Sequence, residues 1–210
     1  MKRILTLVLA LAMLLCVAAS AETYSIQHSN IMETGLDDGT FYVGFALDDV
    51  TDTDITASIY EEVSYDLVDV HYMQVGDTLE TADGEIEITS KEEDEAGNIL
   101  INGGEDEGGV TLKSFDEDNG YHSMVGDLIE RMLVGQAQLT LADEVTISIF
   151  KHDEAWSPLD GYDVVTVAAA DVAATLKDSL SGLGEELTPY QATVLVEGGV
   201  VTEVTVNYVP

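Results

Sequence analysis

The sequence is dominated by short runs in which apolar and β-branched residues alternate with polar ones and end at glycine or aspartate. In residues 84–89, Ile86 and Ile88 fall on one face of an extended chain, and Glu85 and Glu87 fall on the other. A period of two is that of a β-strand with one buried and one solvated face. A chain built from such runs must bury its apolar faces against other strands, so we expect a mainly β fold.

Strands are expected over most of the chain. They are predicted at residues 40–47, 55–60, 84–89, 99–101, 110–113, 138–141, 145–150, 193–196 and 200–208. Two hairpins are predicted among them. One joins 138–141 to 145–150 across residues 142–144, and the other joins 193–196 to 200–208 through Gly198 and Gly199, which suit a tight two-residue turn.

One helix is predicted with a clear pattern, at residues 169–183. Its apolar positions recur every four residues, at Val172, Leu176 and Leu180, and glycines follow them. A second, short helix is predicted at residues 127–135, which begin with an acidic capping pattern and end at a glycine. Since helices and strands do not alternate, the expected fold is an antiparallel sandwich or partly open barrel with one or two helices packed on it; an α+β fold is the alternative.

The first 21 residues have the three parts of a secretory signal peptide. Lys2 and Arg3 are followed by an uncharged apolar run, and Ala19, Ser20 and Ala21 provide a small-residue cleavage site. An uncleaved membrane anchor is the alternative. We expect cleavage, which leaves a secreted or periplasmic chain of residues 22–210 with no integral membrane segment. This part is predicted to be a single acidic β-rich domain, or two lobes with a boundary near residues 115–125.

The chain after the leader is strongly acidic. All 41 Asp and Glu residues lie there, together with five of the seven Lys and Arg residues, which gives a net charge of −36. Such a surface repels nucleic-acid phosphates and anionic lipids, and it attracts cations or a basic protein surface. The only cysteine, Cys16, lies in the leader, so the mature chain has no disulfide. We expect packing, hydrogen bonds or bound ions to stabilise it.

No catalytic residues are predicted. The sequence lacks a Gly-x-Ser-x-Gly elbow, a Ser-x-x-Lys set with its supporting motifs, a phosphate-binding Gly-rich loop and a His-Glu-x-x-His pair. Paired carboxylates could serve a hydrolase, but in so acidic a chain some pair always lies at a suitable distance. An enzyme is therefore the less favoured interpretation, and a carboxylate-dependent hydrolase ranks third.

Two acidic clusters are candidate calcium sites, because Ca²⁺ takes six to eight oxygen ligands from flexible acidic loops. The candidate ligands are Asp48, Asp49, Asp52 and Asp54 in one cluster and Asp116 and Asp118 in the other. Neither cluster matches an EF-hand loop, and a solvated acidic turn is the alternative. No other cofactor is predicted.

Two aromatic residues are candidate interaction residues, since exposed aromatic side chains anchor many interfaces. They are Trp156, in a predicted loop, and Tyr162, which follows it. The leading functional hypothesis is an exported, non-catalytic binding or surface-interaction module for an unknown protein or glycan outside the cytoplasm. The second hypothesis is a calcium-binding or acid-shielded structural protein.

Overall fold

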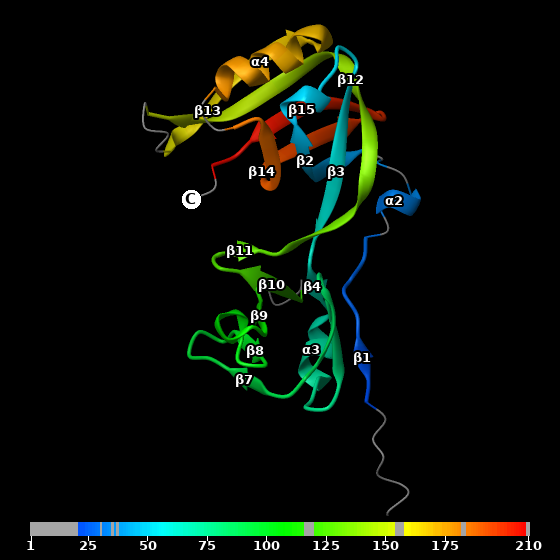
Figure 1. The fold of residues 1–210 in the computed structure, drawn as a ribbon, viewed down its shortest axis with the longest axis vertical. Coiled ribbons are helices and arrows are strands. Elements are labelled where there is room, and N and C mark those ends of the chain that lie inside the picture. Colours follow the sequence, from blue (N-terminus) through cyan, green and yellow to red (C-terminus); the bar gives the residue numbers. More distant parts are fainter. Residues whose placement is uncertain are drawn as a thin grey trace, which may run out of the picture. The chain divides into compact units, whose positions relative to one another are not determined.

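The chain is mainly β and divides into two compact units (Figure 1). The computed structural model describes residues 21–29, 31–34, 36, 38–115, 120–153, 158–181 and 184–208. In this part of the chain, the first unit comprises residues up to 27 together with 64–128, and the barrel unit comprises 28–63 and 129–208. The chain thus passes between the units after residues 27, 63 and 128.

The barrel unit is built on one sheet that closes on itself. Its strands are β2 (Gly39–Ala46), β3 (Asp54–Glu62), β12 (Arg131–His152), β13 (Pro158–Ala168), β14 (Glu186–Glu197) and β15 (Val200–Val206). They lie in the order β13-β12-β15-β14-β2-β3, and β3 also pairs with β12. The additional pairing closes a five-stranded ring, with β13 added at the edge of β12.

The long strand β12 makes this closure possible. Its first part, from Arg131 to Thr140, pairs antiparallel with β3, whereas Thr146–Ile149 pair in parallel with β15 and antiparallel with β13. Between them Asp143 and Glu144 are both exposed, which breaks the alternation, and the register with β15 shifts there. A strand that changes partner part-way along its length joins the two ends of the sheet.

Two predictions about this region are wrong. Residues 138–150 are not a hairpin across 142–144 but one continuous bent strand, because Leu141 and Val145 face the same core on both sides of the bend. Residues 127–135 are not a helix: they include β11 (Leu128–Ile129) and the start of β12. The capping pattern and the four-residue spacing of Leu128 and Met132 are compatible with a helix, but backbone pairing of residues 131–135 with β3 makes this segment extended.

The predicted late helix is confirmed. After a 3₁₀ turn at Ala169–Asp171, α4 (Val172–Ser179) places Val172, Leu176 and the following Leu180 in the core, each at most 1% exposed. These side chains join those of the barrel strands in one apolar cluster, and Figure 1 shows α4 lying along β12 and β13. The predicted β14–β15 hairpin is also confirmed, with Gly198 and Gly199 at φ of 61° and 79° in the turn.

The connectivity of the ring resembles that of the OB fold, a five-stranded Greek-key barrel. In chain order, three ring strands are followed by β13 and α4, and the β14–β15 hairpin then completes the ring. The mainly β prediction with a helix packed on a barrel is therefore confirmed. Because one architecture serves many unrelated functions, the connectivity assigns none to this chain.

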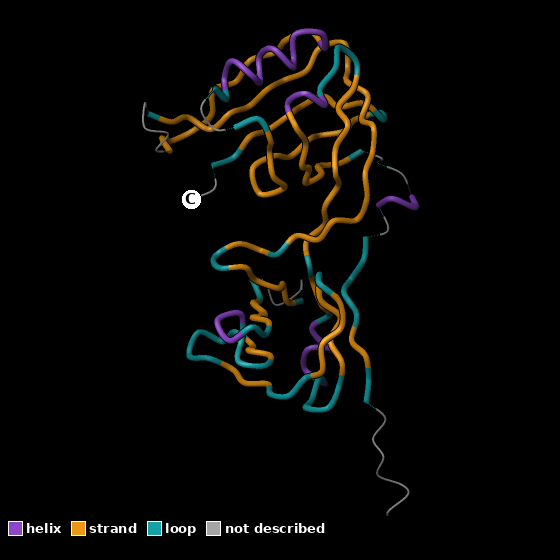
Figure 2. Tube along the Cα trace, in the orientation of Figure 1, coloured by secondary structure: helices purple, strands orange, loops and turns teal. Residues whose placement is uncertain are grey.

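The described part of the first unit contains two small sheets, an α-helix and a 3₁₀ turn, and Figure 2 colours its helical segments purple. One sheet has β1 (Thr23–Tyr24), β5 (Thr78–Thr81) and β6 (Gly84–Glu87). The other has β4 (Ser64–Tyr65), β7 (Lys91–Glu93), β8 (Ile99–Ile101), β9 (Val110–Lys113), β10 (Tyr121–Val125) and β11. The helix is α3 (Leu67–Tyr72), and the fully buried side chains include Tyr65, Leu79, Ile88, Ile101 and Leu112.

The remaining helical segments are short. They are α2 (Ile31–Thr34) and the 3₁₀ turns Leu47–Asp49 and Glu105–Glu107. Within the ranges that the structure describes, no helix is long and apolar enough to cross a bilayer.

Replacing Leu176 by alanine tests the packing of α4 on the barrel. Leu176 is fully buried, so we expect Leu176→Ala to lower the free energy of unfolding by about 2–5 kcal/mol, from lost apolar transfer and the cavity left behind. Urea unfolding measures this. The control is Asp178→Ala on the exposed face of α4, which should change stability by no more than about 0.5 kcal/mol. Equal effects of the two substitutions would contradict this packing.

Candidate functional site

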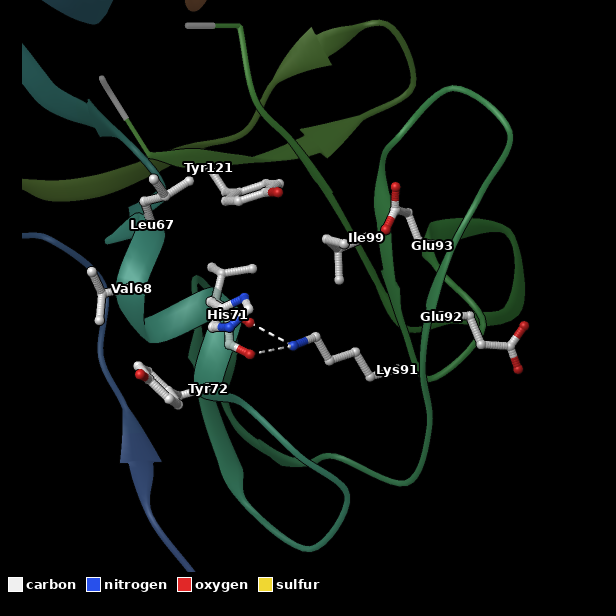
Figure 3. Close-up of a pocket in the computed structure, with 10 residues that line it drawn as sticks. Leu67, Val68, His71, Tyr72, Lys91, Glu92, Glu93, Ile99 and Tyr121 are labelled. Atoms are coloured by element: carbon white, nitrogen blue, oxygen red, sulfur yellow. Dashed lines mark hydrogen bonds between the residues drawn. The ribbon is translucent and has the colours of Figure 1, made fainter. Parts of the chain in front are cut away.

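The first unit contains an open groove of about 760 Å³ (Figure 3). One wall is α3, and the rest comes from β7, β8 and β10. The lining residues are mostly aliphatic or aromatic: Leu67, Val68, Val70, His71, Tyr72, Lys91, Glu92, Glu93, Ile99 and Tyr121. Its volume and its apolar lining are both typical of ligand-binding pockets.

The α3 wall follows from the local sequence. Asp66 lies in the extended conformation just before the helix, and its carboxylate accepts a hydrogen bond from the N–H of Val68 at 2.7 Å, which is an N-terminal cap. Val70 is 1% exposed and anchors the helix, whereas Leu67 and Tyr72 stay exposed, Tyr72 at 67%. The rings of His71 and Tyr72 meet edge to face at 5.2 Å. The helix thus turns one anchor inward and leaves large apolar side chains in solvent.

Lys91 joins the two sides of the groove. Its Nζ donates to the backbone oxygens of Val70 at 2.6 Å, Met73 at 3.0 Å and His71 at 3.3 Å, as Figure 3 shows in part. These carbonyls lie at the end of α3, where a cation is favoured. Burial of the amine lowers the pKa of Lys91 below its usual value. The lysine therefore fixes α3 against β7 and sets the width of the groove.

The charge around the groove is acidic. Glu92 and Glu93 follow Lys91 on β7 and are exposed, and in Figure 3 Glu93 lies beside Ile99 while Glu92 points outward. The amine of Lys91 is engaged with backbone carbonyls rather than directed to solvent. The groove therefore combines an apolar lining with a negatively charged rim.

The predicted calcium ligands do not converge in the described part of the chain. Asp48 pairs with Lys177 at 2.5 Å, and this contact holds the pKa of Asp48 below its usual range. Asp54 accepts hydrogen bonds from the hydroxyls of Thr53 and Thr140, and Asp49 and Asp52 are exposed. Among the residues that the structure describes, no three His, Cys, Asp or Glu side chains are grouped as metal ligands. Asp116 and Asp118 lie outside those residues, and calcium binding stays a prediction.

Tyr162 lies on the edge strand β13 of the barrel unit. Its side chain is 44% exposed, and its hydroxyl donates to Oδ1 of Asn207 at 2.6 Å. Leu159, Val164 and Val165 of the same strand are also exposed, so β13 presents a second apolar surface. Trp156 lies outside the described residues.

In the barrel unit, His28 and Ser29 form a polar cluster with the buried Glu61. One carboxylate oxygen lies 2.7 Å from Nδ1 of His28, and the other accepts the hydroxyl and N–H of Ser29 at 2.5 and 3.0 Å. Burial alone would raise the pKa of Glu61, but the hydrogen bonds from Ser29 and His28 outweigh it and lower the pKa. A general acid needs a raised pKa, so Glu61 is suited to holding residues 28 and 29 in place rather than to acid catalysis.

Comparison with protein-family models, with curated proteins and with solved structures finds no match to this chain. The groove was not predicted from the sequence. Its only local signal is Asp66 before Leu67, a capping residue ahead of a helix too short to show an apolar period.

The role assigned to Lys91 is tested by Lys91→Met, which keeps the length of the side chain and removes its charge and donors. We expect a loss of about 1–3 kcal/mol in the free energy of unfolding, because three carbonyls lose a charged donor. Amide hydrogen exchange should also become faster in α3. Lys113→Met, at an exposed lysine of β9, is the matched control. Unchanged exchange in α3 would show that Lys91 does not hold the helix.

The calcium prediction is tested by thermal melts in chelator, in millimolar calcium and in sodium chloride of equal ionic strength. We expect sodium chloride to raise the melting temperature, because a Debye length of about 10 Å at 0.1 M screens repulsion among the carboxylates. A further rise specific to calcium, reduced by Asp49→Asn with Asp52→Asn, would support binding at that loop. Equal rises in the two salts would contradict calcium binding.

Proposed function

We propose that this chain is an exported, non-catalytic binding module whose groove in the first unit takes an apolar segment of a basic protein partner. The observation that carries the proposal is the groove itself, about 760 Å³ in volume and lined mainly by aliphatic and aromatic side chains in a strongly acidic molecule. Of these, Leu67, Val68 and Tyr72 are exposed. Keeping Leu67 and Tyr72 in solvent has no benefit for folding. Exposed apolar side chains gathered around a hollow are typical of interaction sites.

The chemistry of the lining favours a protein segment over a glycan. Recognition of a sugar relies on several polar side chains directed at its hydroxyls, whereas the walls here are mainly aliphatic and aromatic, and the amine of Lys91 is bonded to backbone carbonyls. The exposed Glu92 and Glu93 and the large negative charge of the chain attract a cation. The best-matched occupant has an aromatic or aliphatic side chain next to lysine or arginine.

Export is the second part of the proposal. It is supported by the positively charged start, the apolar run and the small-residue site of residues 1–21. The absence of cysteine after position 16 fits a chain that folds without oxidation in any compartment.

The binding test uses a defined probe, an acetylated and amidated Lys-Leu-Lys-Phe-Lys peptide, titrated by calorimetry at about 0.15 M salt to suppress diffuse attraction. We expect Tyr72→Ala and Leu67→Ala each to weaken binding about tenfold, which corresponds to loss of an apolar anchor of about 1.4 kcal/mol. Both residues are exposed, so neither change should unfold the unit.

Two controls make the result specific. Val75→Ala removes an exposed apolar side chain of the same unit that does not line the groove, and it should leave the affinity unchanged. A Lys-Ala-Lys-Ala-Lys peptide keeps the charge and should bind at least about tenfold more weakly. If both peptides bind alike, or if Tyr72→Ala has no effect, attraction is purely electrostatic and the groove is not the binding site.

A further inference from the structure

The predicted cleavage site, the Ala21–Glu22 bond, lies directly before the strand β1 of the first unit. Ala21 is exposed, and the next residue, Glu22, bonds to the sheet of the first unit. The backbone oxygen of Glu22 accepts the N–H of Thr78 at 2.8 Å, and Thr23 and Tyr24 then pair in parallel with β5. The backbone on the carboxyl side of the Ala21–Glu22 bond is therefore fixed in the fold.

The backbone nitrogen of Glu22 is directed at a buried carboxylate. It lies 3.1 Å from Oδ1 of Asp77, while Oδ2 of Asp77 accepts the N–H of Gln74 at 2.9 Å. Asp77 is only 3% exposed, one of four polar or charged residues that are buried in the described chain. A buried carboxylate is costly unless it is paired. Two neutral backbone donors compensate that cost only in part.

We propose that cleavage between Ala21 and Glu22 creates a new α-ammonium group and that Asp77 is its binding site. Hydrolysis of the Ala21–Glu22 peptide bond by water gives the carboxylate of Ala21 and the amine of Glu22, which is protonated at neutral pH because the pKa of a free α-amine is about 8. The atom that donates to Asp77 in the uncleaved chain then carries a positive charge. A charge-assisted hydrogen bond is about twice as strong as a neutral one, so removal of the leader stabilises the first unit.

This inference rests on the export part of the proposed function and not on the groove. Asp77 also anchors the segment just before β5, since its own N–H donates to the oxygen of Gln74 and its oxygen accepts the N–H of Ile88. The pair of Glu22 and Asp77 thus ties the N-terminal strand to the turn that begins β5. Removal of the leader therefore also forms the ion pair that stabilises the first unit.

The test compares residues 22–210 with a free amine at Glu22 with the same chain acetylated at that amine. We expect the free form to melt about 2–8 °C higher, because acetylation removes the charge and leaves the geometry. In Asp77→Asn, which keeps the shape of the side chain, the difference should fall below about 1 °C. In Glu85→Gln, a matched loss of charge at an exposed site on β6, the difference should persist.

A second measurement does not depend on the stability of the Asp77 variant. The amine of Glu22 in the folded chain should react with an acylating reagent at neutral pH at least about tenfold more slowly than the amine of the free peptide Glu-Thr-Tyr-Ser-Ile-Gln, since an ion-paired ammonium is a poor nucleophile. Equal rates, or equal melting temperatures of the free and acetylated chains, would overturn the proposal. So would sequencing of the exported protein that finds a first residue other than Glu22. Failure of the groove experiments would leave all three results unaffected.

Discussion

Closure of the barrel depends on β12, because its pairing with β3 joins the last strand of the sheet to a strand that also pairs with β15 and β13. Its first half is held by β3 and its second half by β15 and β13. The side chains of Leu139, Leu141, Val145, Ile147 and Ile149 are all buried in the same cluster. The exposed Asp143 and Glu144 between them mark the place where the strand bends rather than a place where it ends. Without this bend the sheet would have two unpaired edges, and the face covered by α4 would not form a core.

Much of this fold is encoded in local patterns that can be recognised one strand at a time. Alternation predicted the strands of residues 40–47 and 55–60, and the Gly198-Gly199 turn predicted the final hairpin, because each signal lies within the element itself. The continuity of β12 could not be predicted in this way. A bent strand and a hairpin would both place Leu141 and Val145 in the same core, so the local pattern does not distinguish them. Only the pairing of β12 with β3 and β15 shows that the strand is continuous.

The candidate site was harder to predict for a related reason. The groove joins α3, six residues long, to strands of three to five residues, so no segment is long enough to show a period. The contacts that fix it run from the Lys91 side chain to backbone oxygens about 20 residues earlier in the chain. Backbone acceptors have no sequence signature, and Lys91 on its own resembles any lysine of an acidic segment. By contrast, the cleavage position was predicted from the sequence alone. The structure adds that the backbone nitrogen of Glu22 faces the carboxylate of Asp77.

The five basic residues after the leader offset only part of the acidic excess, and they do so in different ways. Lys151 and Lys177 pair with Asp163 and Asp48 at the surface, and Lys113 lies over the ring of Phe115. Lys91 and Arg131 are placed differently. Lys91 binds the end of α3, and Arg131 lies 3.6 Å from the ring centre of Tyr42 and donates to the oxygen of Pro189. The two cations thus bind backbone carbonyls, and Arg131 also contacts the ring of Tyr42 and lies 3.9 Å from the carboxylate of Glu62.

The five cations after the leader cannot neutralise the charge of 41 carboxylates. Their charge must be balanced by ions from the solvent or by a partner, and a basic partner gains from releasing those ions when it binds. In the proposed function, the exposed apolar side chains of the groove select where on this acidic surface a partner binds, since the charge alone is spread too widely to select one place. In that function, the acidity attracts a basic partner, and the groove gives the contact its specificity.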